Sequence, residues 1–383
     1  MTLHFSQPEF ERRQEKTRAA MAERGLDALL IFAQESMYWL TGYDTFGFCF
    51  FQCLVLTSDG RLTLLTRAAD QRQAELTSNL TDIRIWADRG EATPVLQLKE
   101  ILFDLDLLGS RLGVEFDTHG LTAANGRQLD EHLQTFGEME DASNMIPALR
   151  LIKSVAEIAF IRDAARLADA AWDAGLAEIA PGANEAKVLA AMQGAVFEGG
   201  GDYPGNSFIL GSGENALLCR YATGRRHLSD VDQVTLEFAG VYRHYHVAMM
   251  RTVPVGTASA RHLELFEACR EALDAVEEAM RPGQTFGDVF DAHAAEMDSR
   301  GLHPHRLNAC GYSLGARFAP SWMDWPMFYR GNKVEIQPHM TLFAHMILMD
   351  SETGTAMTLG QTYLTTEAAP ESLSKASLDL AVR

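Results

Sequence analysis

The sequence has little of three things: cysteine, positive charge and long apolar runs. Five cysteines, an odd number, are scattered over 383 residues, which argues against a disulfide framework and for a reducing compartment. Cys49 and Cys53 are spaced C-x3-C with no second pair, so a zinc site of the paired-cysteine kind is not expected. With 33 basic against 52 acidic residues the formal net charge is −19, which disfavours partners such as nucleic acid or an anionic membrane.

The apolar residues do not form a segment that would place the chain in a membrane or export it. No stretch reaches the roughly 18 uncharged apolar residues that a spanning helix needs. The first residues are charged throughout and lack the apolar core of a signal peptide. We therefore expect a cytoplasmic protein.

The N-terminal part alternates between helical and strand patterns. An amphipathic helix is predicted over residues 8–25, ending at Gly25, and a buried strand follows over 26–32. The turn signal Ser58-Asp59-Gly60 separates two apolar runs and predicts a hairpin. The later pattern is strand, helix, strand, at 83–86, 96–108 and 112–116. This alternation predicts an α/β domain over residues 1–149.

The join to the second domain is expected at residues 144–154, where Pro147 should interrupt any helix. Ser154 and Glu157 have the spacing of a capping box and begin a long helix that runs to about residue 179. Further patterns predict an α+β domain over residues 150–383, with helices at 183–197, 261–280 and 286–300 and strands at 208–210, 233–239, 245–253, 341–349 and 361–365.

Several stretches, taken in order, resemble one family. Residues 150–154 (RLIKS) are similar to the domain join of creatinase, prolidase and aminopeptidase P, and residues 39–43 (WLTGY) to a motif of their N-terminal domain. Residues 237–255 resemble the strand pair that opens their active site, and residues 311–315 (GYSLG) stand where the family has a glycine-flanked histidine. The resemblance implies an α/β N-terminal domain, a pita-bread C-terminal domain and a homodimer.

The resemblance also places the metal ligands of the family's peptidases, which hold two metal ions with two Asp, one His and two Glu. These five positions fall on Glu237, Ala248, Tyr312, His345 and Gln361. One carboxylate among five cannot hold a pair of hard cations, which need several converging carboxylates. No metal or other cofactor is therefore expected. A single zinc ion held by Glu237, His246 and His345 stays open as an alternative.

Creatinase itself is a metal-free hydrolase, and it too has alanine at the position of Ala248. Its general-base histidine corresponds to Arg220 here, and its two functional glutamates correspond to Met250 and His345, so creatine hydrolysis is not implied. The GYSLG element also resembles ectoine hydrolase, another metal-free member, which opens a cyclic amidine.

The residues that replace the ligands predict an anion-binding pocket with acid–base chemistry. A fixed arginine beside histidines favours a carboxylate, and histidine suits proton transfer near neutral pH. Glu237 is suited to orient a histidine, activate water or act as a nucleophile. The candidate catalytic residues are Glu237, His246, His345 and Tyr312. The candidate substrate-binding residues are Arg220, Gln361, His244 and Arg251.

Each candidate also has a structural interpretation. Glu237 and Arg220 could form a buried ion pair, Tyr312 could be a hydrogen-bonded core residue, and Cys219 could be a nucleophile or a small buried side chain. The aromatic runs 43–51 and 322–329 are too apolar to leave in water, which suits a dimer surface, a pocket wall or a core.

We expect a metal-independent hydrolase of a non-peptide C–N bond in a small carboxylate-bearing metabolite. The alternatives are an Xaa-Pro-type metallopeptidase with an unusual His/Glu site and an inactive binding protein.

Overall fold

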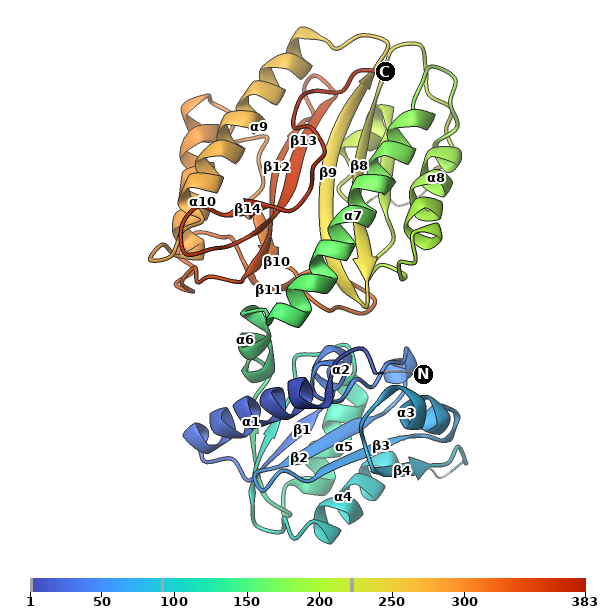
Figure 1. Cartoon of the computed structure of the whole chain (residues 1–383), viewed down its shortest axis with the longest axis vertical. Helices are drawn as coiled ribbons and strands as arrows, with labels where there is room; N and C mark the ends of the chain where they lie inside the picture. The colour runs from blue at the N-terminus through green and yellow to red at the C-terminus, as the bar shows by residue number, and fades with distance from the viewer. Residues whose placement is uncertain (1–2, 91–92, 221–223) are drawn as a thin grey trace. The chain divides into compact units, whose positions relative to one another are not determined.

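The chain folds as two units, Met1–Arg150 and Leu151–Arg383, in a computed structural model that describes residues 3–90, 93–220 and 224–383 (Figure 1). The sequence placed the join between residues 149 and 150, one residue earlier.

The first unit is a six-stranded mixed sheet with helices on both faces. The strand order is β4-β3-β2-β1-β5-β6, with parallel pairing at β3–β4, β1–β5 and β5–β6. The strands are β1 Ala28–Ile31, β2 Cys53–Thr57, β3 Leu62–Arg67, β4 Asp82–Trp86, β5 Arg111–Val114 and β6 Glu138–Asp141. The helices are α1 Gln7–Arg24, α2 Gln34–Thr41, α3 Gln71–Thr77, α4 Pro94–Asp104, α5 Ala123–Leu133 and α6 Met145–Leu151, with short 3₁₀ turns at Gly47–Cys49 and Ala68–Asp70.

Alternation along β1 divides the apolar residues of this unit between two cores. Leu30 packs in the cluster that includes α4 and α5, whereas Leu29 and Ile31 pack in the cluster that includes α1 and α2. Two helix layers on a largely buried sheet confirm the predicted α/β domain. Of the aromatic run 43–51, Tyr43 is buried, whereas Phe46 and Phe50 are 80% and 44% exposed.

Local signals in this unit gave mixed results. Gly25 ends α1 in a left-handed conformation, as expected. The prediction that Pro147 interrupts any helix was wrong, because Pro147 lies in the first turn of α6. The first backbone N–H groups of a helix have no partner within the helix, so proline is tolerated there.

The second unit is an antiparallel sheet whose central strands run in the order β11-β10-β12-β13-β9-β8-β7, with β14 paired to β13. Its strands are β7 Ile209–Ser212, β8 Asp232–Tyr242, β9 Tyr245–Val255, β10 Gly311–Ser313, β11 Asp324–Met327, β12 Thr341–Asp350, β13 Thr355–Leu364 and β14 Glu371–Ser372. Its helices are α7 Val155–Glu178, α8 Glu185–Glu198, α9 Ala260–Ala279 and α10 Phe286–Ser299, and Gly213–Leu217 forms a 3₁₀ turn. The predicted capping box of Ser154 and Glu157 begins α7.

The long helices cover one face of this sheet. Leu342 and Leu359 pack with α9 and α10 in one core, and the ring of Phe238 stacks on Trp172 of α7. Figure 1 shows α7 running along β8 and β9. The contact is closest at Gly240 of β8, where an added Cβ would lie 2.0 Å from the backbone oxygen of Ala164. The α+β arrangement confirms the predicted pita-bread architecture.

None of the helices in the described part of the chain has the length and apolarity that crossing a membrane requires.

Candidate functional site

The strand register places Glu237 and His345 on the face of the sheet opposite to the helices. Glu237 pairs with Met250 and Met250 with Gly360, while Gly360 pairs with His345. Paired residues of an antiparallel sheet share a face, so this face carries Glu237, Met250, Gly360 and His345. Tyr312 joins it through its pairing with Phe343, which lies two positions from His345 on β12.

Glu237 is the acidic residue of this face and is nearly buried, at 8% exposed. The Tyr312 hydroxyl donates to its Oε1 at 3.2 Å. Burial raises the pKa of Glu237 to about 7, although the charge of Arg220 and the Tyr312 hydrogen bond both lower it. A carboxyl group that exchanges its proton near neutral pH is suited to general acid–base chemistry.

Tyr312 lies between Glu237 and a tryptophan that the sequence did not identify as functional. Trp322 Nε1 donates to the Tyr312 oxygen at 2.9 Å, and both side chains are at most 3% exposed. Burial, together with the negative charge of Glu237, raises the pKa of Tyr312 well above its ordinary value. Tyr312 is therefore a neutral phenol at neutral pH. The apolar run 322–329 was visible in the sequence, but nothing in it pointed to this hydrogen bond.

His345 completes the group through ring contacts. Its ring centroid lies 5.6 Å from that of Tyr312 and 5.5 Å from that of Phe343. Within the described residues its Nδ1 has no hydrogen-bond partner. Burial and the charge of Arg220 lower the pKa of His345 to about 4, so the ring is neutral at pH 7. This differs from the expected proton transfer near neutral pH, since the ring can bind a ligand atom but is not an acid there.

Arg220 follows the 3₁₀ turn Gly213–Leu217 and is exposed. Its charge lowers the pKa of both Glu237 and His345, yet the described structure records no ion pair between Arg220 and Glu237. The buried ion pair that the sequence left open is therefore not formed. Burial and the charge of Glu237 raise the pKa of the Cys219 thiol, which opposes its use as a nucleophile.

His246 was predicted to be catalytic. It lies on the site face, with its ring centroid 6.3 Å from that of Trp322, but its two ring nitrogens lie against backbone groups. Its Nε2 accepts from the Gly205 backbone N–H at 2.8 Å, and Nδ1 lies 3.4 Å from the Gly315 carbonyl. His246 pairs with Val241, four positions from Glu237 on β8, which corresponds to about 13 Å along the strand. Burial lowers its pKa to about 3, so His246 is a neutral link between two loops.

His244 was predicted to bind substrate, but it lies in the turn between β8 and β9. It has a φ of 64° and stacks on Phe318 with ring centroids 4.2 Å apart. The turn is farther from Glu237 along the hairpin than His246 is, so the structure does not bring His244 to the group.

Gln361 and Arg251 were also predicted to line the pocket, and both lie on the helix-covered face instead. Gln361 pairs with Ala344, and the Arg251 Nη2 donates to its Oε1 at 3.0 Å. Arg251 also donates to the Met250 and Gly360 carbonyls, and burial lowers its pKa to about 10. The error came from matching the family's second glutamate to Gln361, whereas Gly360 is the residue that pairs with His345 on the site face. A shift of one residue exchanges the two faces of a strand.

The corrected register places Gly360, with no side chain, on the site face. A Cβ added at Gly360 would lie 2.7 Å from Cζ of Phe343, so the Phe343 ring fills this space. Ala248 also offers no ligand atom. Among the described residues no three His, Cys, Asp or Glu side chains gather as a metal site, which also contradicts a zinc ion at Glu237, His246 and His345. The residues present do not fit the metal pair of the family's peptidases.

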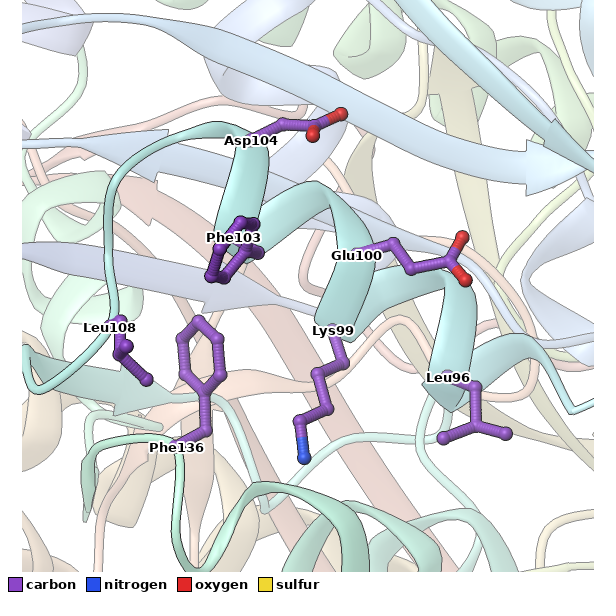
Figure 2. Close-up of a pocket in the computed structure, with 7 residues that line it drawn as sticks. All are labelled: Leu96, Lys99, Glu100, Phe103, Asp104, Leu108 and Phe136. Carbon is purple, nitrogen blue, oxygen red and sulfur yellow. The ribbon is translucent and has the colours of Figure 1, made fainter.

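A separate hollow of about 650 Å³ lies along α4 in the first unit (Figure 2). Phe103, Leu108 and Phe136 gather at one end of it, whereas Glu100 and Asp104 point away from it (Figure 2). None of the predicted site residues lines this hollow, and its two carboxylates, Glu100 and Asp104, are exposed. The Glu237 group is therefore the better candidate for a catalytic site. The seven lining residues are Leu96, Lys99, Glu100, Phe103, Asp104, Leu108 and Phe136.

The fold and the position of the Glu237 group define a two-domain protein of the creatinase and prolidase kind. The chain belongs to metallopeptidase family M24, whose model matches residues 159–367, and residues 13–152 match the creatinase/prolidase N-terminal domain.

Two named relatives of the chain are hydrolases. Ectoine hydrolase from Halomonas elongata is 28% identical over 391 residues, covering 98% of this chain and 97% of the relative. Xaa-Pro dipeptidase from Pyrococcus furiosus is 22% identical, covering 96% and 99%. The chain is thus a member of a hydrolase family.

Solved structures agree on the fold. The prolidase from Thermococcus sibiricus superposes with a TM-score of 0.87 at 19% identity, over 98% of this chain and 99% of that one. Dipeptidase PepE from Mycobacterium ulcerans gives 0.85 at 22% identity, over 99% of each chain. At this identity the likeness establishes the architecture alone.

Proposed function

We propose that the protein hydrolyses a non-peptide C–N bond in a small metabolite that carries a carboxylate, and that it does so without a metal ion. The observation that carries the proposal is the buried Glu237 carboxyl, whose pKa lies near 7 and which is bound by a neutral Tyr312. It stands on a face where Ala248 and Gly360 offer no ligand atom for a cation. The site therefore has a group that can exchange a proton, but it lacks the set of carboxylate ligands that a metal ion needs.

The chemistry assigned to Glu237 is general base followed by general acid. The ionised carboxylate removes a proton from water while the water oxygen bonds to the amide or amidine carbon. The C–N bond then breaks, and the proton held by Glu237 passes to the leaving nitrogen. Tyr312 stays protonated and keeps its bond to Oε1. The Nδ1 of the neutral His345, which has no hydrogen-bond partner among the residues that the structure describes, accepts a substrate N–H. Arg220 faces the substrate carboxylate as its counter-ion.

Similarity to ectoine hydrolase makes ectoine the first compound to test. Ring opening by the purified protein should be followed by NMR, with creatine and an Xaa-Pro dipeptide assayed in parallel. Turnover of ectoine, or of another cyclic amidine with a carboxylate, is the expected result.

Metal removal should leave this activity unchanged. Elemental analysis should find no stoichiometric divalent metal, because Ala248, Tyr312 and Gly360 supply no anionic ligand at their positions. Dialysis against a chelator should then not alter kcat. If Xaa-Pro dipeptide cleavage is found instead, and is lost with chelator and restored by Mn²⁺, the protein is a metallopeptidase and the proposal is wrong.

The Arg220→Lys variant should bind substrate more weakly, with about a tenfold rise in KM and a smaller change in kcat. Lysine keeps the charge but loses the planar fork that binds a carboxylate through two parallel hydrogen bonds. Steady-state kinetics measure this, with Arg225→Lys as a control at an exposed neighbouring position. Equal KM values for Arg220→Lys and wild type would show that Arg220 does not bind a substrate carboxylate.

A further inference from the structure

The hydrogen bonds around Tyr312 have only one self-consistent direction. An indole N–H donates and cannot accept, so the Trp322 Nε1 contact at 2.9 Å makes the Tyr312 oxygen an acceptor. The single hydroxyl proton of Tyr312 cannot point at Trp322, because it would meet another proton. Glu237 Oε1, at 3.2 Å, is then the acceptor for this proton.

We propose that Trp322 is a positioning residue, which fixes the Tyr312 hydroxyl so that its proton always points to Glu237 Oε1. One oxygen of the carboxylate is thereby occupied, and the other is left to take the proton from water. The catalytic part of this inference rests on the proposed function. The hydrogen bond between Trp322 and Tyr312 does not, and it is tested without substrate.

The indole is held firmly enough to act in this way. Trp322 is 1% exposed, and its backbone N–H donates to Asn206 Oδ1 at 3.1 Å. The neighbouring Gly205 approaches so closely that an added Cβ would lie 2.8 Å from the Trp322 nitrogen. Gly205 in turn donates to His246 Nε2, so the loop that confines the tryptophan is itself anchored to β9. The backbone at Trp322 is therefore fixed by its neighbours, and the indole that it carries is buried.

The hydrogen bond from Trp322 to Tyr312, which fixes the direction of the other, can be detected in the indole N–H signals. The chain has five tryptophans, so ¹⁵N-tryptophan labelling gives five resonances, and the one missing in Trp322→Phe belongs to Trp322. In Tyr312→Phe this resonance should move upfield while the other four stay in place, because the acceptor oxygen has been removed. An unmoved Trp322 resonance in Tyr312→Phe overturns the proposal, whether or not a substrate is known.

The catalytic consequence is tested by a double-mutant cycle on kcat. Trp322→Phe should lower kcat about tenfold with little change in KM, which corresponds to one lost hydrogen bond of ordinary strength. In the Tyr312→Phe background the same change should cost less than about twofold, since the hydroxyl that it positions is already absent.

A matched control separates positioning from packing. Trp172→Phe removes another buried indole, on the helix-covered face of the same sheet, and should leave kcat within about twofold of wild type. Equal tenfold losses from Trp322→Phe in both backgrounds would mean that Trp322 acts by packing alone. If the Trp322 resonance shifts in Tyr312→Phe but the wild type hydrolyses no C–N bond, the hydrogen bonds are confirmed and the proposed function is wrong.

Discussion

Replacing Glu237 with glutamine is expected to lower kcat/KM by about 10²–10⁴-fold, the range usual for loss of a general base. Glutamine keeps the size of the side chain and still accepts a hydrogen bond from Tyr312, but it cannot take a proton from water. In the wild type the base must be ionised. Because burial places the pKa of Glu237 at about 7, kcat/KM should rise with pH to a plateau, with its midpoint near 7. The measurement is the pH profile of the initial rate for both proteins.

Stability supplies an independent check on the same residue. The pKa of Glu237 is raised from 4.5 to about 7 in the folded state, so the folded protein binds this proton more tightly than the unfolded chain. That contribution is present in full below pH 4.5 and is lost as the pH rises through 7, by up to ~3 kcal/mol. The free energy of unfolding of Glu237→Gln, relative to wild type, should therefore increase between pH 5 and pH 8.

The control for this residue is Glu214→Gln, at an exposed carboxylate in the 3₁₀ turn before Arg220, which should leave both the rate and the stability difference unchanged. A Glu237→Gln protein that is folded and retains wild-type turnover would eliminate Glu237 as the base.

The Gly240→Ala variant is expected to lose at least ~3 kcal/mol of stability and to express poorly, the outcome of forcing a large clash into a packed core. Its Cβ would meet the Ala164 backbone oxygen at 2.0 Å and the Ala168 backbone nitrogen at 2.2 Å. Both atoms belong to the middle of the 24-residue helix α7, so neither moves without displacing the helix from the sheet. Urea unfolding followed by circular dichroism measures the loss.

Gly194→Ala is the matched comparison for this variant. Gly194 lies inside α8, and a Cβ added there meets nothing within 4 Å. Alanine should therefore stabilise the protein by about 0.5–1 kcal/mol through its better helix propensity. If both variants are equally stable, then the close contact between α7 and β8 does not restrict position 240 to glycine.

Local signals predicted much of the fold because each depends on a few neighbouring residues. Gly25 ended a helix and Ser154 with Glu157 began one, as the structure shows. Helices α2 and α5 and strand β6 were not predicted, because their sequences carry no strong start, stop or periodic signal. The overall architecture was predicted instead from the ordered set of motifs that resemble those of creatinase, prolidase and aminopeptidase P.

The site was harder to predict because it depends on register and on long-range hydrogen bonds. Gln361 was assigned one residue away from the site position, and in a strand that error moves a side chain to the other face. His246 is polar and buried in the expected strand, but its partners Gly205 and Gly315 are backbone groups far away in sequence. Trp322 was predicted only as part of an apolar run suited to a dimer surface, a pocket wall or a core, and nothing in that run indicated the hydrogen bond from its N–H to Tyr312.

The ring of Phe343 at Gly360 bears on how such a site changes over evolutionary time. Restoring a glutamate at position 360 alone would drive its Cβ to within 2.7 Å of the Phe343 Cζ and 2.9 Å of the Met250 Cβ. Restoring an aspartate at Ala248 alone would bury a charge without a cation to balance it. Each of these substitutions is destabilising by itself, and a metal ion could bind only if several ligands were introduced together. The packing of Phe343 against Gly360 thus makes a side chain at position 360 costly unless the ring moves as well.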